Sequence, residues 1–264
     1  MNKNPLFWTP QPVTSPSLRL FCFPFAGGSA QTFTFLKANL DPSVEIVLIE
    51  YPGRGRNFQS PPSESMSQLV DSLLDNYRQL PAASSVFLGH SLGACVAWEL
   101  MRNMRERGIV LPRLLIASGC SGAHLASNLT RIHDLPDEEF VQALKGLEGT
   151  PQEVLEHDEL LALLKPMLRA DFKIAEQYCA PAERMPVPIL GLAGTQDELA
   201  TPQRVQAWSE LTDDFRIELI EGGHFFMNTH PEDVVTYVNQ AISPLLCGTR
   251  SRETSEFSEL YTSC

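Results

Sequence analysis

Short runs of consecutive apolar residues recur along the chain and alternate with longer segments of helical spacing. Two of the helical segments, Met66–Leu80 and Leu92–Arg107, carry apolar residues every three or four positions. An apolar run of strand length that does not alternate with polar residues is typical of a strand buried on both faces. Six runs fit this description: Leu18–Phe25, Val44–Ile49, Val86–Leu88, Leu114–Ala117, Val187–Ala193 and Phe215–Ile220. Strands that alternate with helices predict an α/β fold, with a mostly parallel sheet flanked by helices and joined by right-handed crossovers.

The alternation stops between residues 124 and 186. Two segments in this region, DEEFVQALKGL and HDELLALLKPMLRADFKIAEQYC, show helical spacing, and no strand-like run lies between them. A single crossover rarely needs so many residues. We therefore expect a helical insertion, and we expect it to form a lid over the functional site. The alternative is a pair of ordinary crossover helices.

The two ends of the chain are more polar than its middle. Residues 1–17 contain four prolines, so the first strand is expected at Leu18. Segment 248–264 is rich in Ser and Thr and is expected to be disordered. The 264 residues are expected to form a single α/β domain that carries the insertion.

Composition and charge narrow the class of protein. Apolar residues make up 43% of the chain and charged residues 20%, as in globular proteins with a sizeable core. No apolar run is long enough to span a bilayer, and the start has no long apolar segment, so we expect a soluble, cytoplasmic protein. The formal net charge of -12 argues against binding to nucleic acid or to an anionic membrane, because both need clustered Lys and Arg. The six cysteines form no CxxC pair and are expected to be reduced packing residues.

A serine motif provides the strongest chemical signal. Gly89-His90-Ser91-Leu92-Gly93 is a G-x-S-x-G that follows the strand-like SSVFLGH and precedes the helical LGACVAWELM. A serine hydroxyl is a weak nucleophile, so it needs a sharp turn that exposes it to a base, and flanking glycines leave room for that turn. The start of a helix favours negative charge, which makes the Leu92 N–H a candidate oxyanion donor. The alternative is a purely structural turn.

The base should lie downstream, because the order in this type of site is serine, acid, histidine. His224 follows the expected strand Phe215–Ile220 through Glu221-Gly222-Gly223, and such a loop can carry an imidazole over the nucleophile. We therefore assign the base to His224, with a structural loop histidine as the alternative. The other histidines lie next to the serine, in or beside the insertion, or before a proline that starts a helix: His90, His124, His133, His157 and His230.

Asp197 is the candidate acid. It follows the expected strand Val187–Ala193 through Gly194-Thr195-Gln196, which places it at the carboxyl end of the strand before the histidine strand. There it can accept the imidazole Nδ1–H, fix the tautomer and stabilise the imidazolium. The nearest rival is Glu198. Weaker candidates lie in helical or strand-start segments: Asp171, Asp213 and Asp214.

A second oxyanion donor should come from the loop after the first expected strand, Phe23-Pro24-Phe25-Ala26-Gly27-Gly28. Gly27 and Gly28 would let the backbone approach a substrate closely. The alternative is a plain glycine turn.

Several segments together resemble the type II thioesterases that accompany polyketide and non-ribosomal peptide synthetases, and more distantly the medium-chain thioesterase of fatty-acid synthesis. The resemblance extends from about Phe7 to Leu246. Its segments are FCFPFAGGSA, YPGRGR at Tyr51–Arg56, GHSLGACVAWEL, GTPQEVL at Gly149–Leu155, LRADF at Leu168–Phe172 and GGHFF at Gly222–Phe226.

The resemblance implies an α/β-hydrolase fold and a catalytic triad of Ser91, Asp197 and His224. It also implies an oxyanion hole formed by the amides of Ala26 and Leu92. Two departures concern the shape of the pocket: Phe25 stands where the family commonly has His, and Leu92 where it commonly has Met.

The implied activity is hydrolysis of acyl thioesters on the phosphopantetheine arms of acyl or peptidyl carrier proteins, or of small acyl thioesters, with no metal or redox cofactor. An acidic carrier would be repelled at long range by the net charge and must therefore dock through local contacts. Arg54, Arg56 and Lys173 offer local positive charge, although we interpret each as a solvated surface cation. Three other classes stay compatible with the sequence: a carboxylesterase or lipase, an acyltransferase or cyclase, and a non-catalytic scaffold.

Overall fold

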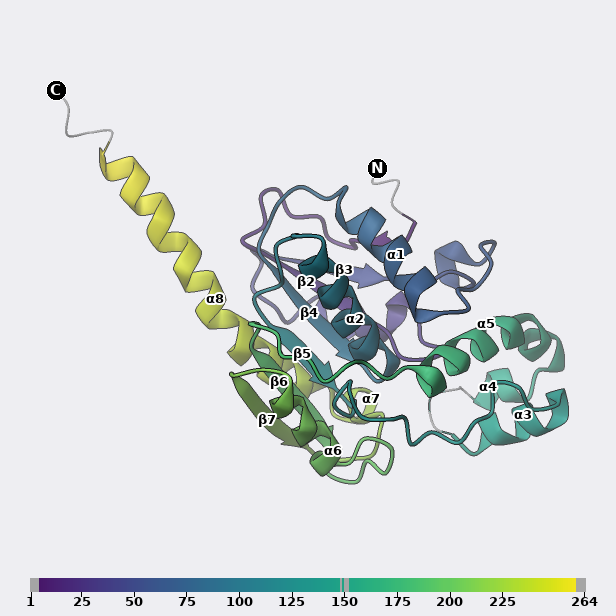
Figure 1. Ribbon diagram of the computed structural model, residues 1–264. Coiled ribbons are helices and arrows are strands. Elements are labelled where there is room, and N and C mark those ends of the chain that lie inside the picture. The colour runs from purple at the N-terminus through teal and green to yellow at the C-terminus, as the bar shows by residue number, and fades with distance from the viewer. Residues whose placement is uncertain (1–4, 148, 150–151, 260–264) are drawn as a thin grey trace.

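A seven-stranded sheet forms the centre of the computed structural model, in the order β1-β3-β2-β4-β5-β6-β7 (Figure 1). The structure describes residues 5–147, 149 and 152–259, and for residues 152–153 and 247–259 it describes the backbone alone. β1 pairs antiparallel with β3, and the other neighbouring strands pair in parallel. The strands are β1 Phe7–Trp8, β2 Leu18–Phe23, β3 Val44–Ile49, β4 Ser85–His90, β5 Leu115–Ser118, β6 Ile189–Gly194 and β7 Phe215–Ile220.

Helices connect the strands and cover the sheet. α1 and α2 confirm the two helical segments predicted from the spacing of apolar residues, and each ends slightly earlier than predicted. Outside the insertion the helices are α1 Met66–Tyr77, α2 Leu92–Glu106, α6 Pro202–Gln206, α7 Phe226–Thr229 and α8 Pro231–Glu259, with 3-10 turns at Ala30–Leu36, Gly55–Asn57 and Ala207–Glu210. Among the described residues, no helix is both long and apolar enough to cross a membrane.

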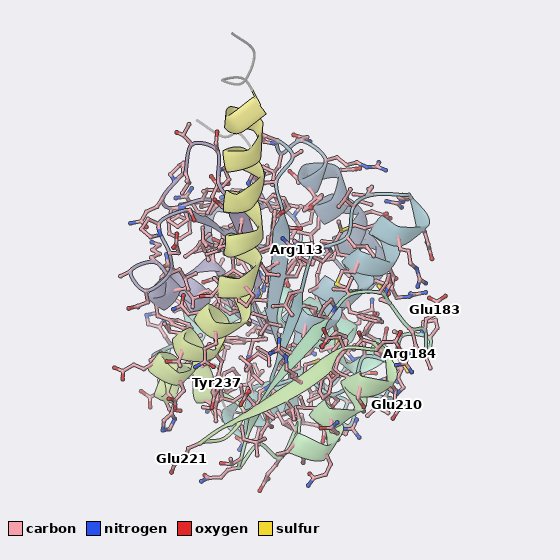
Figure 2. The ribbon with its side chains drawn as sticks, turned by 90° about the vertical axis from the view of Figure 1, so that its left-hand side faces the viewer. Arg113, Glu183, Arg184, Glu210, Glu221 and Tyr237 are labelled. Carbon is pink, nitrogen blue, oxygen red and sulfur yellow. The ribbon has the colours of Figure 1, made fainter. Side chains whose placement is uncertain are left out.

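Both faces of the sheet are covered by apolar side chains, which explains why its inner strands are continuous apolar runs. Along β2, Phe21 and Phe23 belong to the cluster that α1 and α2 cover, whereas Leu20 and Cys22 belong to the cluster on the opposite face. Figure 2 shows α8, marked by Tyr237, lying across that second face. The six predicted strands and the α/β layering are therefore confirmed.

The start of the chain differs from the sequence expectation, whereas the expectation for its end is not decided. β1 precedes Leu18, where the first strand was expected, and its two residues pair with Ile49 and Leu48. A strand of this length is too short to show a pattern of its own. At the other end, the helical backbone of α8 continues to Glu259, and residues 260–264 lie outside the described residues. The disorder expected for segment 248–264 stays a prediction.

The insertion between β5 and β6 is helical, and its described residues contain no strand. Its helices are α3 Asp137–Lys145, α4 Gln152–Leu155 and α5 Asp158–Gln177. They pack around an apolar cluster of their own, which includes Phe140, Leu144 and Leu168. Figure 1 shows these helices beside the body of the molecule, to the right of the sheet.

Candidate active site

Ser91 lies on a sharp turn between β4 and α2. Its φ of 54° and ψ of -121° are values that a residue with a side chain rarely adopts. The turn needs small neighbours, since a Cβ on Gly89 would lie 2.4 Å from the nitrogen of Ala94. A Cβ on Gly93 would lie 2.0 Å from the oxygen of Phe23, at the end of β2. The missing side chains therefore allow the start of α2 to pack directly against β2 and present the hydroxyl at the carboxyl end of the sheet.

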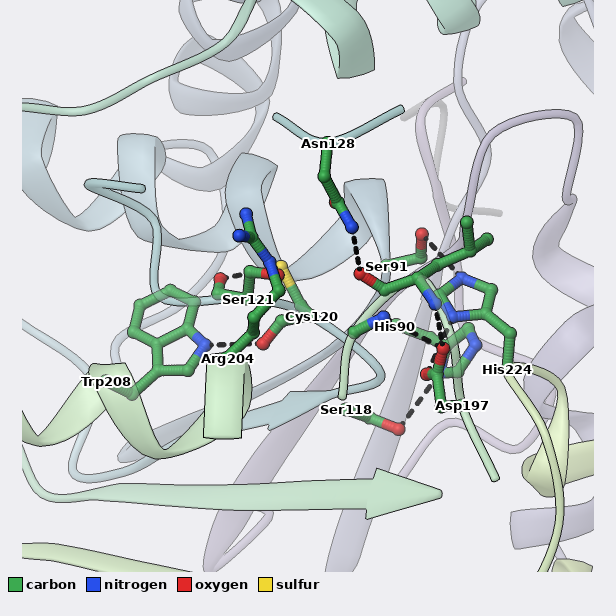
Figure 3. Close-up of polar contacts among 12 residues, drawn as sticks. His90, Ser91, Ser118, Cys120, Ser121, Asn128, Asp197, Arg204, Trp208 and His224 are labelled. Atoms are coloured by element: carbon green, nitrogen blue, oxygen red, sulfur yellow. Dashed lines mark hydrogen bonds and ion pairs between the residues drawn. The ribbon is translucent and has the colours of Figure 1, made fainter. Parts of the chain in front are cut away.

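The structure brings Ser91, His224 and Asp197 together in one hydrogen-bonded chain (Figure 3). The Ser91 Oγ lies 3.0 Å from His224 Nε2, and His224 Nδ1 lies 2.8 Å from Asp197 Oδ2. A carboxylate accepts hydrogen bonds, so the imidazole proton belongs on Nδ1 and leaves Nε2 free to accept the serine proton. His224 reaches this position from the loop after β7, where Gly222 has a φ of 119°. This arrangement can activate a serine for nucleophilic attack.

The loop after β6 holds the carboxyl of Asp197 from its second oxygen. Oδ1 accepts hydrogen bonds from the amides of Leu199 at 2.9 Å and Ala200 at 2.8 Å. Burial acts to raise the pKa of this carboxyl, but the hydrogen bond and charge of His224, together with the two amides, outweigh burial and lower the pKa below its usual value. The carboxylate therefore stays charged and can stabilise an imidazolium.

Among the described residues, none of the rival acids forms a hydrogen bond with His224. Glu198 is exposed, and so are Asp213 and Asp214. Asp171 is buried, but it lies on α5 and pairs with Arg54. Of the five carboxyl groups considered from the sequence, only that of Asp197 contacts the imidazole among the described residues.

A second buried imidazole adjoins the site. His90 is fully buried, and the centre of its ring lies 5.2 Å from that of His224. Burial, with a smaller contribution from His224, lowers the pKa of His90 to about 3, so this ring stays neutral at physiological pH. Its Nδ1 lies 2.9 Å from the Oγ of Ser118 on the neighbouring strand β5. His90 thus supports the site as an uncharged packing group.

The two candidate oxyanion donors flank the turn. Leu92 is the first residue of α2, so its N–H has no carbonyl partner within the helix. Ala26 lies in the loop after β2, in a turn closed by a hydrogen bond from the Gly28 amide to the Phe25 carbonyl at 2.9 Å. Gly27 has a φ of 79° in this turn, as a type II turn requires at its third position. The close packing of Gly93 against the end of β2 brings this loop beside Ser91.

Comparison with known proteins decides the family. A family model for the thioesterase domain matches residues 18–242. The chain belongs to the thioesterase family. This thioesterase is 36% identical over 220 residues to thioesterase PikA5 of Streptomyces venezuelae, and the match covers 82% of the chain and 78% of that protein. It is 34% identical over 235 residues to a protein of Streptomyces griseus named probable cadicidin biosynthesis thioesterase, covering 88% of the chain but only 64% of that longer protein.

Solved structures agree with this family. The thioesterase is similar to the type II thioesterase BorB from the borrelidin biosynthetic cluster, with 28% identity and a TM-score of 0.80. The match covers 91% of this chain and 97% of that one. The predictions of an α/β-hydrolase fold and of a thioesterase are therefore confirmed.

Two cavities of the thioesterase border His224. The first has a volume of about 70 Å³ and is lined by Ser91, Asn128 and Tyr178, among others. The second has a volume of about 420 Å³ and lies between residues 146–147 of the insertion and the loops after β6 and β7. Asn128 and Tyr178 belong to no motif of the sequence, and their one signal is their place in a segment expected to cover the site.

The interpretation of Arg54 as a solvated surface cation is wrong. Its side chain is only 4% exposed, because it forms an ion pair with Asp171 of α5. Arg56 is exposed and lies 4.6 Å above the ring of Trp8, and Lys173 pairs with the exposed Glu64. The three cations therefore have different environments, and Arg54 is the one that the fold encloses.

Proposed function

We propose that this thioesterase releases acyl groups from the phosphopantetheine arms of acyl or peptidyl carrier proteins, with Ser91 as nucleophile, His224 as base and Asp197 as acid. The observation that carries the proposal is the hydrogen-bonded chain from Ser91 through His224 to Asp197, set on a strand-to-helix turn in a chain of the thioesterase family. This combination supplies an activated hydroxyl where a thioester carbonyl can reach it.

Acylation begins when the Ser91 Oγ attacks the thioester carbonyl carbon and His224 Nε2 takes the hydroxyl proton. The developing oxyanion accepts hydrogen bonds from the amides of Ala26 and Leu92, and the charged Asp197 stabilises the imidazolium. When the tetrahedral intermediate collapses, the carbon–sulfur bond breaks and His224 returns the proton to the departing thiolate. A water activated by His224 then attacks the acyl-serine and releases the free acid.

The two cavities on His224 support a substrate that crosses the site. The smaller cavity, beside Ser91 and Tyr178, suits the acyl group. The larger one passes between residues 146–147 and the loops after β6 and β7, and suits the thin pantetheine arm. In this arrangement the helical insertion acts as a lid, because it lines both cavities.

Carrier docking rests on short-range contacts in this proposal. The chain has a formal net charge of -12, which repels an acidic carrier at distances where charges are not screened. A docked carrier improves catalysis by positioning the thioester carbonyl rather than by faster encounter. Small acyl thioesters share the reacting group and lack this positioning.

The test compares one acyl group on three handles: a carrier-protein thioester, the coenzyme A thioester and a matched oxygen ester. Released acid is measured by mass spectrometry at low and high ionic strength, with Ser91→Ala as the control for background hydrolysis. We expect kcat/KM to be highest on the carrier and lowest on the oxygen ester, with little effect of salt. A preference for the oxygen ester would support a carboxylesterase instead, and equal rates on carrier and coenzyme A would refute carrier recognition.

A further inference from the structure

A buried ion pair joins two segments that the mechanism above does not use, YPGRGR and LRADF. Arg54, in the loop after β3, donates to both carboxyl oxygens of Asp171 on α5, from Nη1 at 2.6 Å and from Nη2 at 2.7 Å. Each side chain is 4% exposed. Such bidentate arginine–carboxylate pairs are among the strongest and most directional hydrogen-bonded contacts in proteins.

The same pair holds the oxyanion loop. The Gly27 amide donates to Asp171 Oδ2 at 2.7 Å, and Arg54 Nη1 donates to the carbonyl of Gly28 at 3.0 Å. These groups belong to the residues that directly follow Ala26, the proposed second oxyanion donor. The ion pair therefore holds the loop through two hydrogen bonds: Arg54 supplies the donor of one, and Asp171 supplies the acceptor of the other.

Helix α5 also contacts this loop directly. A Cβ on Gly27 would lie 2.7 Å from the Cδ2 of Leu168, so the helix side chain packs against the glycine backbone. On the other side of the loop, the hydroxyl of Tyr51 donates to the carbonyl of Pro24 at 3.3 Å. The position of the Ala26 amide thus depends on the seating of α5 on the core.

Stability alone does not account for the pair. Removing two charges from water is costly, and apolar residues of similar size often replace a buried ion pair without loss of stability. An apolar pair cannot accept a hydrogen bond from Gly27 or donate one to Gly28. The ion pair also leaves no net charge near the place where the oxyanion forms, because Arg54 neutralises the Asp171 carboxylate.

We propose that Arg54 and Asp171 are positioning residues that set the Ala26 amide for the oxyanion, so that the oxyanion hole is complete only when α5 is seated on the core. The proposal rests on the proposed function, because it assumes attack by Ser91 and an oxyanion at Ala26. It makes the helical insertion part of the catalytic geometry as well as a cover for the substrate.

The test uses Asp171→Asn and the double variant Arg54→Met with Asp171→Leu, which removes both charges together. Lys173→Gln is the matched control, because Lys173 also lies on α5 and forms an ion pair with a residue outside the insertion, the exposed Glu64, yet this pair makes no hydrogen bond to the oxyanion loop. For each protein the measurements are the melting temperature, kcat and KM on one small acyl thioester, and the inhibition constant of an acyl trifluoromethyl ketone that forms an oxyanion on Ser91.

We expect the double variant to stay folded, with kcat lower by about 10- to 100-fold and KM nearly unchanged, because an interaction made only in the transition state is lost. Its inhibition constant should rise by a similar factor, and Lys173→Gln should match wild type. A folded double variant with wild-type kcat, or one in which KM alone rises, would overturn the proposal. Failure of the wild-type chain to hydrolyse any thioester would instead overturn the proposed function. If Asp171→Asn does not fold, the double variant still decides the question.

Discussion

The loops at the end of the sheet and the helical insertion contribute to the site in different ways. The loops hold Ser91 and Asp197 through backbone: a strained turn between glycines for the first, and two amides for the second. The insertion has its own apolar cluster and meets the oxyanion loop through side chains, above all Asp171. The proposed reactive groups are therefore fixed by the fold of the sheet, whereas the proposed substrate cavities depend on how the insertion packs.

The most severe change should be removal of the proposed nucleophile. Ser91→Ala should lower kcat by at least about 10³-fold while leaving the melting temperature close to wild type, because the backbone turn does not depend on the hydroxyl. His224→Ala should be similarly damaging, and the two changes together should add little, since the residues act as one unit. Additive losses in kcat would contradict a shared role.

The next largest loss of activity should follow from a change at the proposed triad carboxylate. Asp197→Asn should slow turnover by roughly 10²- to 10⁴-fold with the fold retained, because an asparagine cannot stabilise the imidazolium and favours the wrong tautomer. Glu198→Gln is the control: it changes the adjacent, exposed carboxyl and should leave kcat near wild type. The opposite ranking of the two variants would move the acid by one position.

The sheet core should also be sensitive to acid through His90. Its pKa in the folded chain is about 3, against 6.5 for an ordinary histidine, so below pH 6.5 the unfolded chain binds a proton that the folded chain does not. The free energy of unfolding should therefore fall by about 1.4 kcal/mol for each pH unit below this value, until the folded pKa is reached. Urea unfolding of wild type and His90→Gln near neutral and mildly acidic pH measures the effect. If the unfolding free energy of the two proteins depended on pH with the same slope, His90 would bind its proton equally well in the folded and the unfolded chain, and its pKa would not be lowered by folding.

The smallest effect on activity should follow from a change inside the insertion. Phe140→Ala should loosen the insertion alone, because Phe140 is buried in a cluster separate from the sheet core. We expect faster proteolysis between residues 124 and 186, an unchanged core, and a shift of a few-fold in the preference for acyl-chain length. Unfolding of the whole chain would indicate that the insertion is an integral crossover.

The sequence predicted those parts of the fold and of the candidate site that depend on residues close together in the chain. Strands buried on both faces are apolar throughout, so they can be recognised in the sequence. The glycines on both sides of Ser91 predict a tight turn, because a larger residue at these positions would not fit. The environment of Arg54 was not predictable in this way, because its partner Asp171 is 117 positions away in the chain and only tertiary packing brings them together. The same limit applies to β1, whose two residues become a strand only by pairing with β3.

The order of the site along the chain also bears on how the protein folds. The oxyanion loop follows β2, the serine follows β4, the carboxylate follows β6 and the imidazole follows β7. A site built at the ends of four strands is complete only when nearly the whole sheet has assembled. Parallel strands pair residues that are distant in sequence, so they form slowly. Turnover should therefore report completed folding: on refolding we expect it to recover with the slowest phase, after helix content and collapse have returned.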